Sequence, residues 1–206
     1  MSLLQHLGTK VGIIRNRIDG LREAWNRDEV RSISRRYLIS NGFDGTLTSI
    51  GMTVGSFLSG VESGMIVVTV GIGATIGLAT SGVWSVWEIE KSEKLSDLHD
   101  LENKMLRDLT DTELTEQMQN ARLINAVASG TGPVFGIMLP VLPFALAGIY
   151  YSLLTATLLS ILIGMGVLFI MGSYMGRISR RTWYIAGLRM AIAGLVVAGV
   201  NYLLPG

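Results

Sequence analysis

The hydrophobic positions of this chain form long uncharged runs that are separated by charged blocks. Residues 63–87 contain no Asp, Glu, Lys or Arg, and neither do residues 123–176. A membrane-spanning helix needs about 20 apolar residues, so the first run suits one crossing and the second suits two. Two further runs contain one charge each, Asp44 and Arg189. The pattern predicts an all-α membrane protein with five transmembrane helices, at about 40–60, 64–87, 124–147, 151–173 and 182–204.

The basic residues lie on alternate connections between these expected spans. They occupy the segment before the first span, the second connection and the fourth connection, whereas the first and third connections contain no Lys or Arg. Cytoplasmic loops of membrane proteins carry an excess of Lys and Arg. The distribution therefore places the N-terminus in the cytoplasm and the C-terminus outside.

The charged blocks divide the chain into four segments. Residues 1–36 form a basic segment in which apolar residues recur as in an amphipathic helix. Such a helix is expected to lie in the cytoplasmic membrane interface, or else to pack on the rest of the protein. Residues 37–87 hold transmembrane helices 1 and 2, and residues 123–206 hold helices 3 to 5. Between them, residues 88–122 are predicted to form a short, acidic, cytoplasmic helical hairpin.

The acidic hairpin is expected to continue the spans on either side of it. Apolar residues recur at helical spacing after Glu88, so the second span should extend into the cytoplasm as a helix. Thr110 followed by Glu113 has the spacing of a capping box, which begins a new helix leading into the third span. The sequence therefore predicts a turn near Thr110.

Asp44 is the most informative residue, because a carboxylate within a span costs about 2.5–3.5 kcal/mol on insertion scales. An ion, a proton or a buried partner usually offsets that cost. Alternatively, Asp44 lies near the membrane surface and only caps or orients its helix. We assign it to an expected transport path together with Thr48, Met52 and Arg189.

Arg189 is a candidate partner for Asp44. Each lies about seven residues, or about 10 Å, from the cytoplasmic start of its expected helix. Opposite charges at one depth offset each other's insertion cost. The two are expected to form an ion pair with which an arriving cation or proton competes. The alternative is that Arg189 extends its aliphatic stem to the interface and never meets Asp44.

Two pairs of glutamates in the acidic hairpin have i,i+3 spacing. Glu90 with Glu93, and Glu113 with Glu116, would each share one face of a helix. Brought together, the two pairs would give an oxygen-rich site for a divalent cation. The alternative is a solvated hairpin whose acids pair with neighbouring lysines and arginines.

Three prolines, Pro133, Pro140 and Pro143, lie in the third span. Proline removes a backbone N–H and frees the carbonyl one turn earlier. At membrane depth, freed carbonyls are tolerated where they face protein or a watery cavity. The prolines therefore fit a conduction path or a kinked structural helix.

The composition narrows the function classes. Cysteine is absent, which excludes disulfides, thiolate metal sites and a thiol nucleophile. The net charge of +1 gives no indication of nucleic acid binding. We find no Ser/His/Asp set and no phosphate-binding loop, and we expect neither an enzyme nor a tightly bound cofactor.

Four stretches of the chain match motifs that occur together in one known family. The first span carries Gly42, Asp44, Gly45, Thr48 and Gly51, similar to G-x-D-G-x-x-T-x-x-G. The second continues into an acidic helix, SVWEIEKSEK. The third contains FGIMLPVLPF, similar to G-x-x-x-P-L-x-P-aromatic. The last resembles W-x-x-G-L-x-M…G…Y through Trp183, Gly187, Leu188, Met190, Gly194 and Tyr202. Through these motifs the chain resembles the vacuolar iron transporter family over roughly residues 35–204.

The resemblance implies a homodimer that exports ferrous iron, and in some members manganese, from the cytosol by proton antiport. The conduction path would lie between subunits and include Asp44. The cytoplasmic metal ligands would be Glu90, Glu93, Glu113 and Glu116. When the second span is aligned with the family, Leu78 and Gly82 occupy the positions of a methionine and a glutamate that face the metal in the family.

We therefore expect a membrane transporter that exports Fe²⁺ or Mn²⁺ by proton antiport. Its partners would be a second copy of itself, the lipid bilayer, the cation and protons. The alternative is a non-transporting membrane scaffold or lipid-contacting protein on the same fold, in which Arg189 permanently neutralises Asp44.

Overall fold

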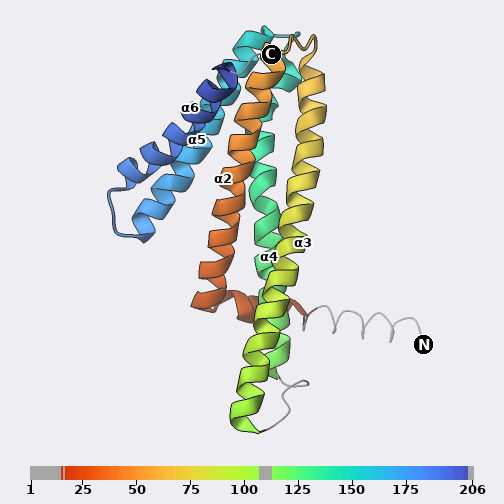
Figure 1. Ribbon diagram of the computed structural model, residues 1–206, viewed down its shortest axis with the longest axis vertical. Coiled ribbons are helices and arrows are strands. Elements are labelled where there is room, and N and C mark those ends of the chain that lie inside the picture. The colour runs from red at the N-terminus through yellow and green to blue at the C-terminus, as the bar shows by residue number, and fades with distance from the viewer. Residues whose placement is uncertain (1–14, 16, 107–112, 204–206) are drawn as a thin grey trace, which may run out of the picture. The chain divides into compact units, whose positions relative to one another are not determined.

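The computed structural model describes residue 15 and residues 17–106 and 113–203 of the 206-residue chain. The described residues form helices joined by short turns, and no strand. The long helices are α2 (Asp28–Leu58), α3 (Gly64–Met105), α4 (Glu113–Val141), α5 (Leu153–Ile178) and α6 (Trp183–Leu203), with a short 3-10 helix, η1 (Leu142–Leu146), after α4 (Figure 1). The predicted all-α class is confirmed.

Four of these segments are long and apolar enough to cross a membrane. They are Gly64–Met105, Glu113–Leu146, Leu153–Ile178 and Trp183–Leu203, and they overlap the second to fifth expected spans. The first expected span, at about 40–60, lies mostly in α2, which is not one of the four candidate membrane spans. The hydroxyl side chains of Thr46, Ser49 and Thr53 on α2 are completely buried. Part of α2 is thus covered by protein, where polar side chains bond to neighbouring helices.

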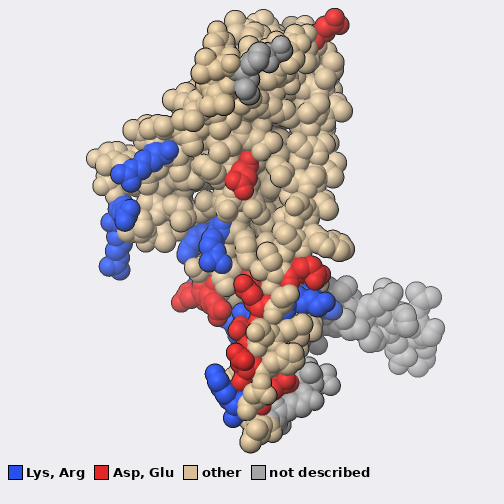
Figure 2. Space-filling model, viewed as in Figure 1, with Lys and Arg blue, Asp and Glu red and all other residues tan. Residues whose placement is uncertain are grey.

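The helix α3 confirms that the second expected span continues as a helix into the charged segment that follows it. It contains 42 residues without a break, or about 63 Å at 1.5 Å per residue, which is about twice the thickness of a bilayer core. In Figure 2 red and blue side chains gather along the part of α3 that approaches Met105. The predicted turn at Thr110 lies outside the described residues.

The chain divides into two compact units. The first unit contains Met1–Tyr37 and Val83–Ala128, and the second contains Leu38–Gly82 and Ser129–Gly206. The helices α2, α3 and α4 contribute residues to both units, whereas α5 and α6 belong to the second.

In the second unit, α2 and α4 touch at glycines. A Cβ atom added to Gly136 would lie 2.5 Å from the Gly42 carbonyl oxygen, and one added to Gly132 would lie 2.6 Å from that of Leu38. Both contacts are with backbone, which has no rotamer to change. The two helices therefore approach so closely that only glycine fits, as is common between membrane helices.

The carbonyls freed by two of the prolines are satisfied by side chains of α2. Pro133 frees the carbonyl of Ser129, which accepts a hydrogen bond from Asn41 Nδ2 at 3.3 Å. Pro140 frees the carbonyl of Gly136, which lies 3.3 Å from Ser49 Oγ, and this hydroxyl shares its one hydrogen with the Thr46 carbonyl at 2.9 Å. Of the two interpretations left open by the sequence, this arrangement supports the structural one for both prolines, because each carbonyl faces protein.

The Asn41 amide also joins three helices of the second unit. Its Nδ2 donates to Ser129 Oγ on α4, and this hydroxyl donates to the carbonyl of Gly82 on α3 at 2.8 Å. Removing Asn41 would leave the Ser129 carbonyl without its side-chain donor.

We expect Asn41→Leu to lower the free energy of unfolding by about 0.6–2 kcal/mol, the range for hydrogen bonds between membrane helices. Ser40→Leu is the matched control, because Ser40 is exposed on the same turn. Unfolding of both variants in one detergent measures the difference. Equal stability of the two would show that the Asn41 amide does not hold these helices together.

Candidate functional site

Asp44 lies well inside α2 and is exposed on its surface. Because α2 begins at Asp28, Asp44 does not cap the end of the helix. Among the described residues, its carboxylate has no hydrogen-bond or ion-pair partner. The structure therefore presents a free carboxylate on the surface of the single chain, within a segment otherwise free of charge from residue 38 to residue 61.

The two other α2 residues of the expected path have local partners. Thr48 is exposed one turn after Asp44, and its hydroxyl donates to the Asp44 carbonyl at 2.8 Å. Met52 is half-buried and packs against a core formed by Val67, Phe144 and Ala156. Thr48 thus shares the exposed face of Asp44, whereas the Met52 thioether contributes to apolar packing.

The expected ion pair between Asp44 and Arg189 is not formed. Within the part of the chain that the structure describes, ion pairs join Arg31 to Asp28 and Lys94 to Glu29. Arg189 instead lines a pocket at the α5–α6 turn. Its long aliphatic stem allows this, which agrees with the alternative that Arg189 extends toward the interface.

Glu90, in the first unit, is buried although its side chain is ionisable. Only 1% of its surface is exposed, and the Tyr37 phenol is hydrogen-bonded to its carboxylate. Burial and the charge of Glu90 raise the pKa of the Tyr37 phenol, so the phenol keeps the proton that it donates. The Oε2 atom of Glu90 has no hydrogen-bond partner among the described residues. A buried carboxylate oxygen without a partner is costly, and a cation or a proton would offset that cost.

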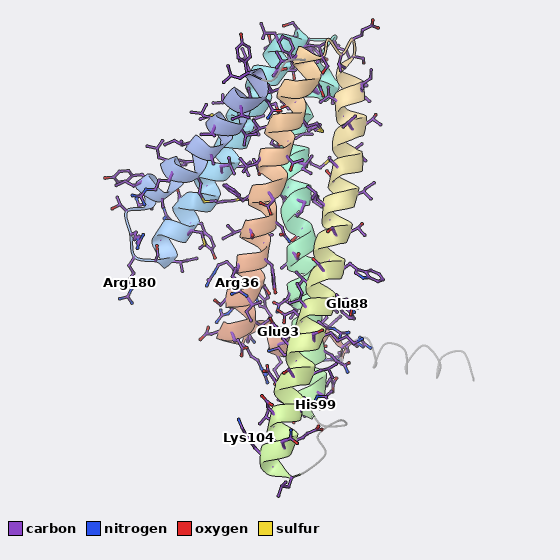
Figure 3. The ribbon with its side chains drawn as sticks, viewed as in Figure 1. Arg36, Glu88, Glu93, His99, Lys104 and Arg180 are labelled. Carbon is purple, nitrogen blue, oxygen red and sulfur yellow. The ribbon has the colours of Figure 1, made fainter. Side chains whose placement is uncertain are left out.

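The other three predicted glutamates are exposed. Glu93 follows Glu90 on α3, where Figure 3 labels it, and Glu113 and Glu116 lie in the first turn of α4. Gln117 donates to the Glu113 carboxylate at 3.2 Å. Within the described ranges, no group of three or more acidic or histidine side chains is gathered as a metal site. The four glutamates are therefore not assembled into one site in this structure.

The sequence pattern did not single out three further residues of the first unit. Tyr37 is one, and the others are Trp87 and Arg122, whose guanidinium lies 3.6 Å from the centre of the indole ring. All belong to the first unit, and the Arg122 Nε is buried without a hydrogen bond to the described residues. The sequence feature that could have identified them is their position as polar or aromatic residues at the ends of the uncharged runs. The sequence pattern does not show that α2 places Tyr37 beside Glu90 of α3, or that α4 places Arg122 on Trp87.

The position of Gly82 is filled from the neighbouring helices. A Cβ atom there would lie 2.9 Å from Ser129 Oγ and 3.2 Å from Asn41 Nδ2. The resemblance places a metal-facing glutamate at this position. In this chain a neutral amide and a hydroxyl occupy the space beside it, so a longer side chain would require them to move.

Comparison with known proteins bears out the resemblance. The model of the VIT family matches residues 87–205, more than half of the chain. The chain is also similar to the uncharacterized protein MJ0645 of Methanocaldococcus jannaschii, with 26% identity over 172 residues that cover 82% of this chain and 87% of the relative. The family match includes the α3 segment that carries Glu90 and all of α4, η1, α5 and α6. The chain therefore belongs to the VIT family, a family of membrane metal transporters.

Proposed function

We propose that the protein exports a divalent cation, Fe²⁺ or Mn²⁺, from the cytosol in exchange for protons. The observation that carries this proposal is Asp44, a carboxylate without a partner among the described residues, on the surface of a helix within an otherwise uncharged segment. Membership of the VIT family supports a metal as the cargo. An intramembrane carboxylate of this kind binds a cation or carries a proton, and antiport needs both capacities.

The proposal includes α2 as a fifth span and a homodimer. Five crossings would place the N-terminus in the cytoplasm and the C-terminus outside, as the distribution of basic residues indicates. In a single chain, Asp44 would face lipid at a cost of a few kcal/mol. A second copy packed against this face of α2 would remove both carboxylates from lipid and place them along a path between the subunits.

Glu90 is the residue proposed to capture the metal on the cytoplasmic side. Its free Oε2 atom is preorganised by burial and by the hydrogen bond with Tyr37. Glu93, Glu113 and Glu116 would approach when a cation binds, because divalent cations of this class take several oxygen ligands.

We expect Glu90→Gln to weaken Mn²⁺ binding at least about tenfold, and the fourfold Gln variant at 90, 93, 113 and 116 to abolish it. Binding should also weaken as the pH falls, because carboxylate ligands must be deprotonated. Calorimetry on the full chain in detergent measures both effects. Glu88→Gln is the control, since Glu88 is an exposed acid on the same helix. Unchanged binding in the fourfold variant would favour a solvated hairpin.

A flux assay tests the transport function itself. The full chain in vesicles should move Fe²⁺, kept anaerobic, or Mn²⁺ against a proton gradient of opposite direction, and collapse of the gradient should slow the flux. The second candidate function is a non-transporting membrane scaffold or lipid-contacting protein. The packing at Gly82 favours it, because neutral groups fill the space where the resemblance places a ligand. Flux equal to that of protein-free vesicles would decide for this second candidate.

A further inference from the structure

The turn between α5 and α6 borders an open basic pocket that the transport proposal does not use. The pocket has a volume of about 540 Å³. Its charged and polar lining consists of Arg180, Arg181, Arg189, Ser179 and Thr182. In Figure 2 the hairpin of α5 and α6 is tan except for blue side chains toward this turn. We call this cavity the turn pocket.

Close packing of the two helices forms the base of the turn pocket. A Cβ atom on Gly172 would lie 2.6 Å from the Ala186 carbonyl oxygen, and one on Gly176 would lie 2.9 Å from Trp183 Cα. The chain then reverses through Arg180, labelled in Figure 3, whose backbone is left-handed with φ of 53°. Glycine would adopt this conformation more easily. The turn geometry therefore does not itself require an arginine at this position.

The arginines of the turn pocket carry uncompensated charge. None of the residues that line it is acidic, and within the described ranges none of Arg180, Arg181 and Arg189 forms an ion pair. Arg177 differs from them, because its guanidinium lies 5.6 Å from the centre of the Trp183 ring and it does not line the pocket. Three arginines that line one open pocket can form a site for an anion, and arginine is especially suited to phosphate.

The position of the turn pocket indicates that its phosphate ligand belongs to a membrane lipid. Both helices are apolar enough to cross a membrane, so their connecting turn lies at a membrane surface. Arg189 is about 9 Å further along α6 than its first residue, and the headgroup layer is about 5–8 Å thick. The pocket thus extends from the aqueous surface to the edge of the hydrocarbon. Its remaining wall includes Met175, Ile185 and Met190, which would contact the glycerol and the upper acyl chain.

We propose that the turn pocket binds the phosphate headgroup of an anionic phospholipid. The guanidinium groups of Arg180 and Arg181 bind the phosphate at the surface, and Arg189 binds it from below. Basic pockets between membrane helices recognise such headgroups in general. The site would hold the α5–α6 hairpin in register with one leaflet.

Native mass spectrometry of the full chain tests this proposal. The protein is released from phosphatidylcholine micelles that contain phosphatidylglycerol, and the retained phosphatidylglycerol is counted by mass. A parallel sample receives inorganic phosphate at the same concentration. We expect one tightly retained phosphatidylglycerol per chain, about fivefold weaker binding in Arg180→Gln or Arg181→Gln, and a roughly multiplicative loss in the double variant.

The control is Arg177→Gln, which removes the same charge from the same turn without altering the pocket lining. It should retain phosphatidylglycerol as the wild type does. Equal weakening by Arg177→Gln and Arg181→Gln would overturn the proposal, because it would show general surface attraction. Retention unaffected by the double variant, or displacement of the lipid by inorganic phosphate at equal concentration, would overturn it as well.

Discussion

Asp44→Asn is expected to reduce proton-coupled Mn²⁺ flux to the level of protein-free vesicles while leaving the protein folded. Asparagine has nearly the same shape but neither carries a proton nor supplies a charge to the cation. The Asp44 carboxylate has no hydrogen-bond partner among the described residues, so its replacement breaks no contact described there. Removing a charge from a span also removes an insertion cost of about 2.5–3.5 kcal/mol. Stability should therefore stay equal or rise as transport is lost.

The loss of flux without a loss of stability is tested by measuring both properties on the same preparation of each protein. Vesicle flux and thermal unfolding in detergent are compared for wild type, Asp44→Asn and Glu62→Gln. Glu62 is an exposed acid beyond the end of α2 and serves as the matched control. Full flux in Asp44→Asn would remove Asp44 from the transport path. Loss of folding instead of flux would mean that Asp44 has a structural role.

Gly136→Ala is expected to lower the free energy of unfolding by about 1–3 kcal/mol, the usual effect of overpacking. The added Cβ would lie 2.5 Å from the Gly42 carbonyl oxygen and 2.9 Å from the Thr46 backbone nitrogen. Since both contacts are with backbone, α2 and α4 must separate. The separation also weakens the hydrogen bond from Ser49 to the Gly136 carbonyl.

Gly73→Ala provides a control of opposite sign. Gly73 lies within α3, and a Cβ atom there would meet nothing within 4 Å. Alanine favours a helix over glycine by up to about 1 kcal/mol. The same chemical change should therefore destabilise the protein at Gly136 and leave it equal or more stable at Gly73. Detergent unfolding that ranks the two variants the other way would contradict the close α2–α4 contact.

The third expected span shows how far sequence reasoning reaches. The presence of Pro133 and Pro140 establishes that two carbonyls lose their helical partners. Whether these carbonyls face a path or the protein depends on what α2 places beside them. Asn41 and Ser49 are distant in the chain from Ser129 and Gly136, yet they donate to these carbonyls. Such partners follow from the register of one helix on another.

The four glutamates also show that sequence spacing alone does not determine which candidate metal residues are buried. Their i,i+3 spacing gives all four equal standing in the sequence. In the structure Glu90 is buried beside Tyr37, whereas Glu93, Glu113 and Glu116 are exposed. Helical periodicity identifies residues that share a face, but the packing of α2 and α4 decides which faces are covered.

The sequence by itself determined the features that depend on local composition. Uncharged runs of sufficient length predicted the all-helical class and five spans, of which the structure gives four as candidates. The continuity of apolar spacing extended α3 beyond its span, and the motif order identified the family. Only the tertiary structure decided which polar groups find partners. Among the described residues it left Asp44 without a side-chain partner and unpaired with Arg189, buried Glu90 and placed three arginines along the turn pocket. The physical reason is that hydrogen bonds and burial depend on contacts between segments distant in the chain, and these contacts follow from helix packing rather than from any local pattern.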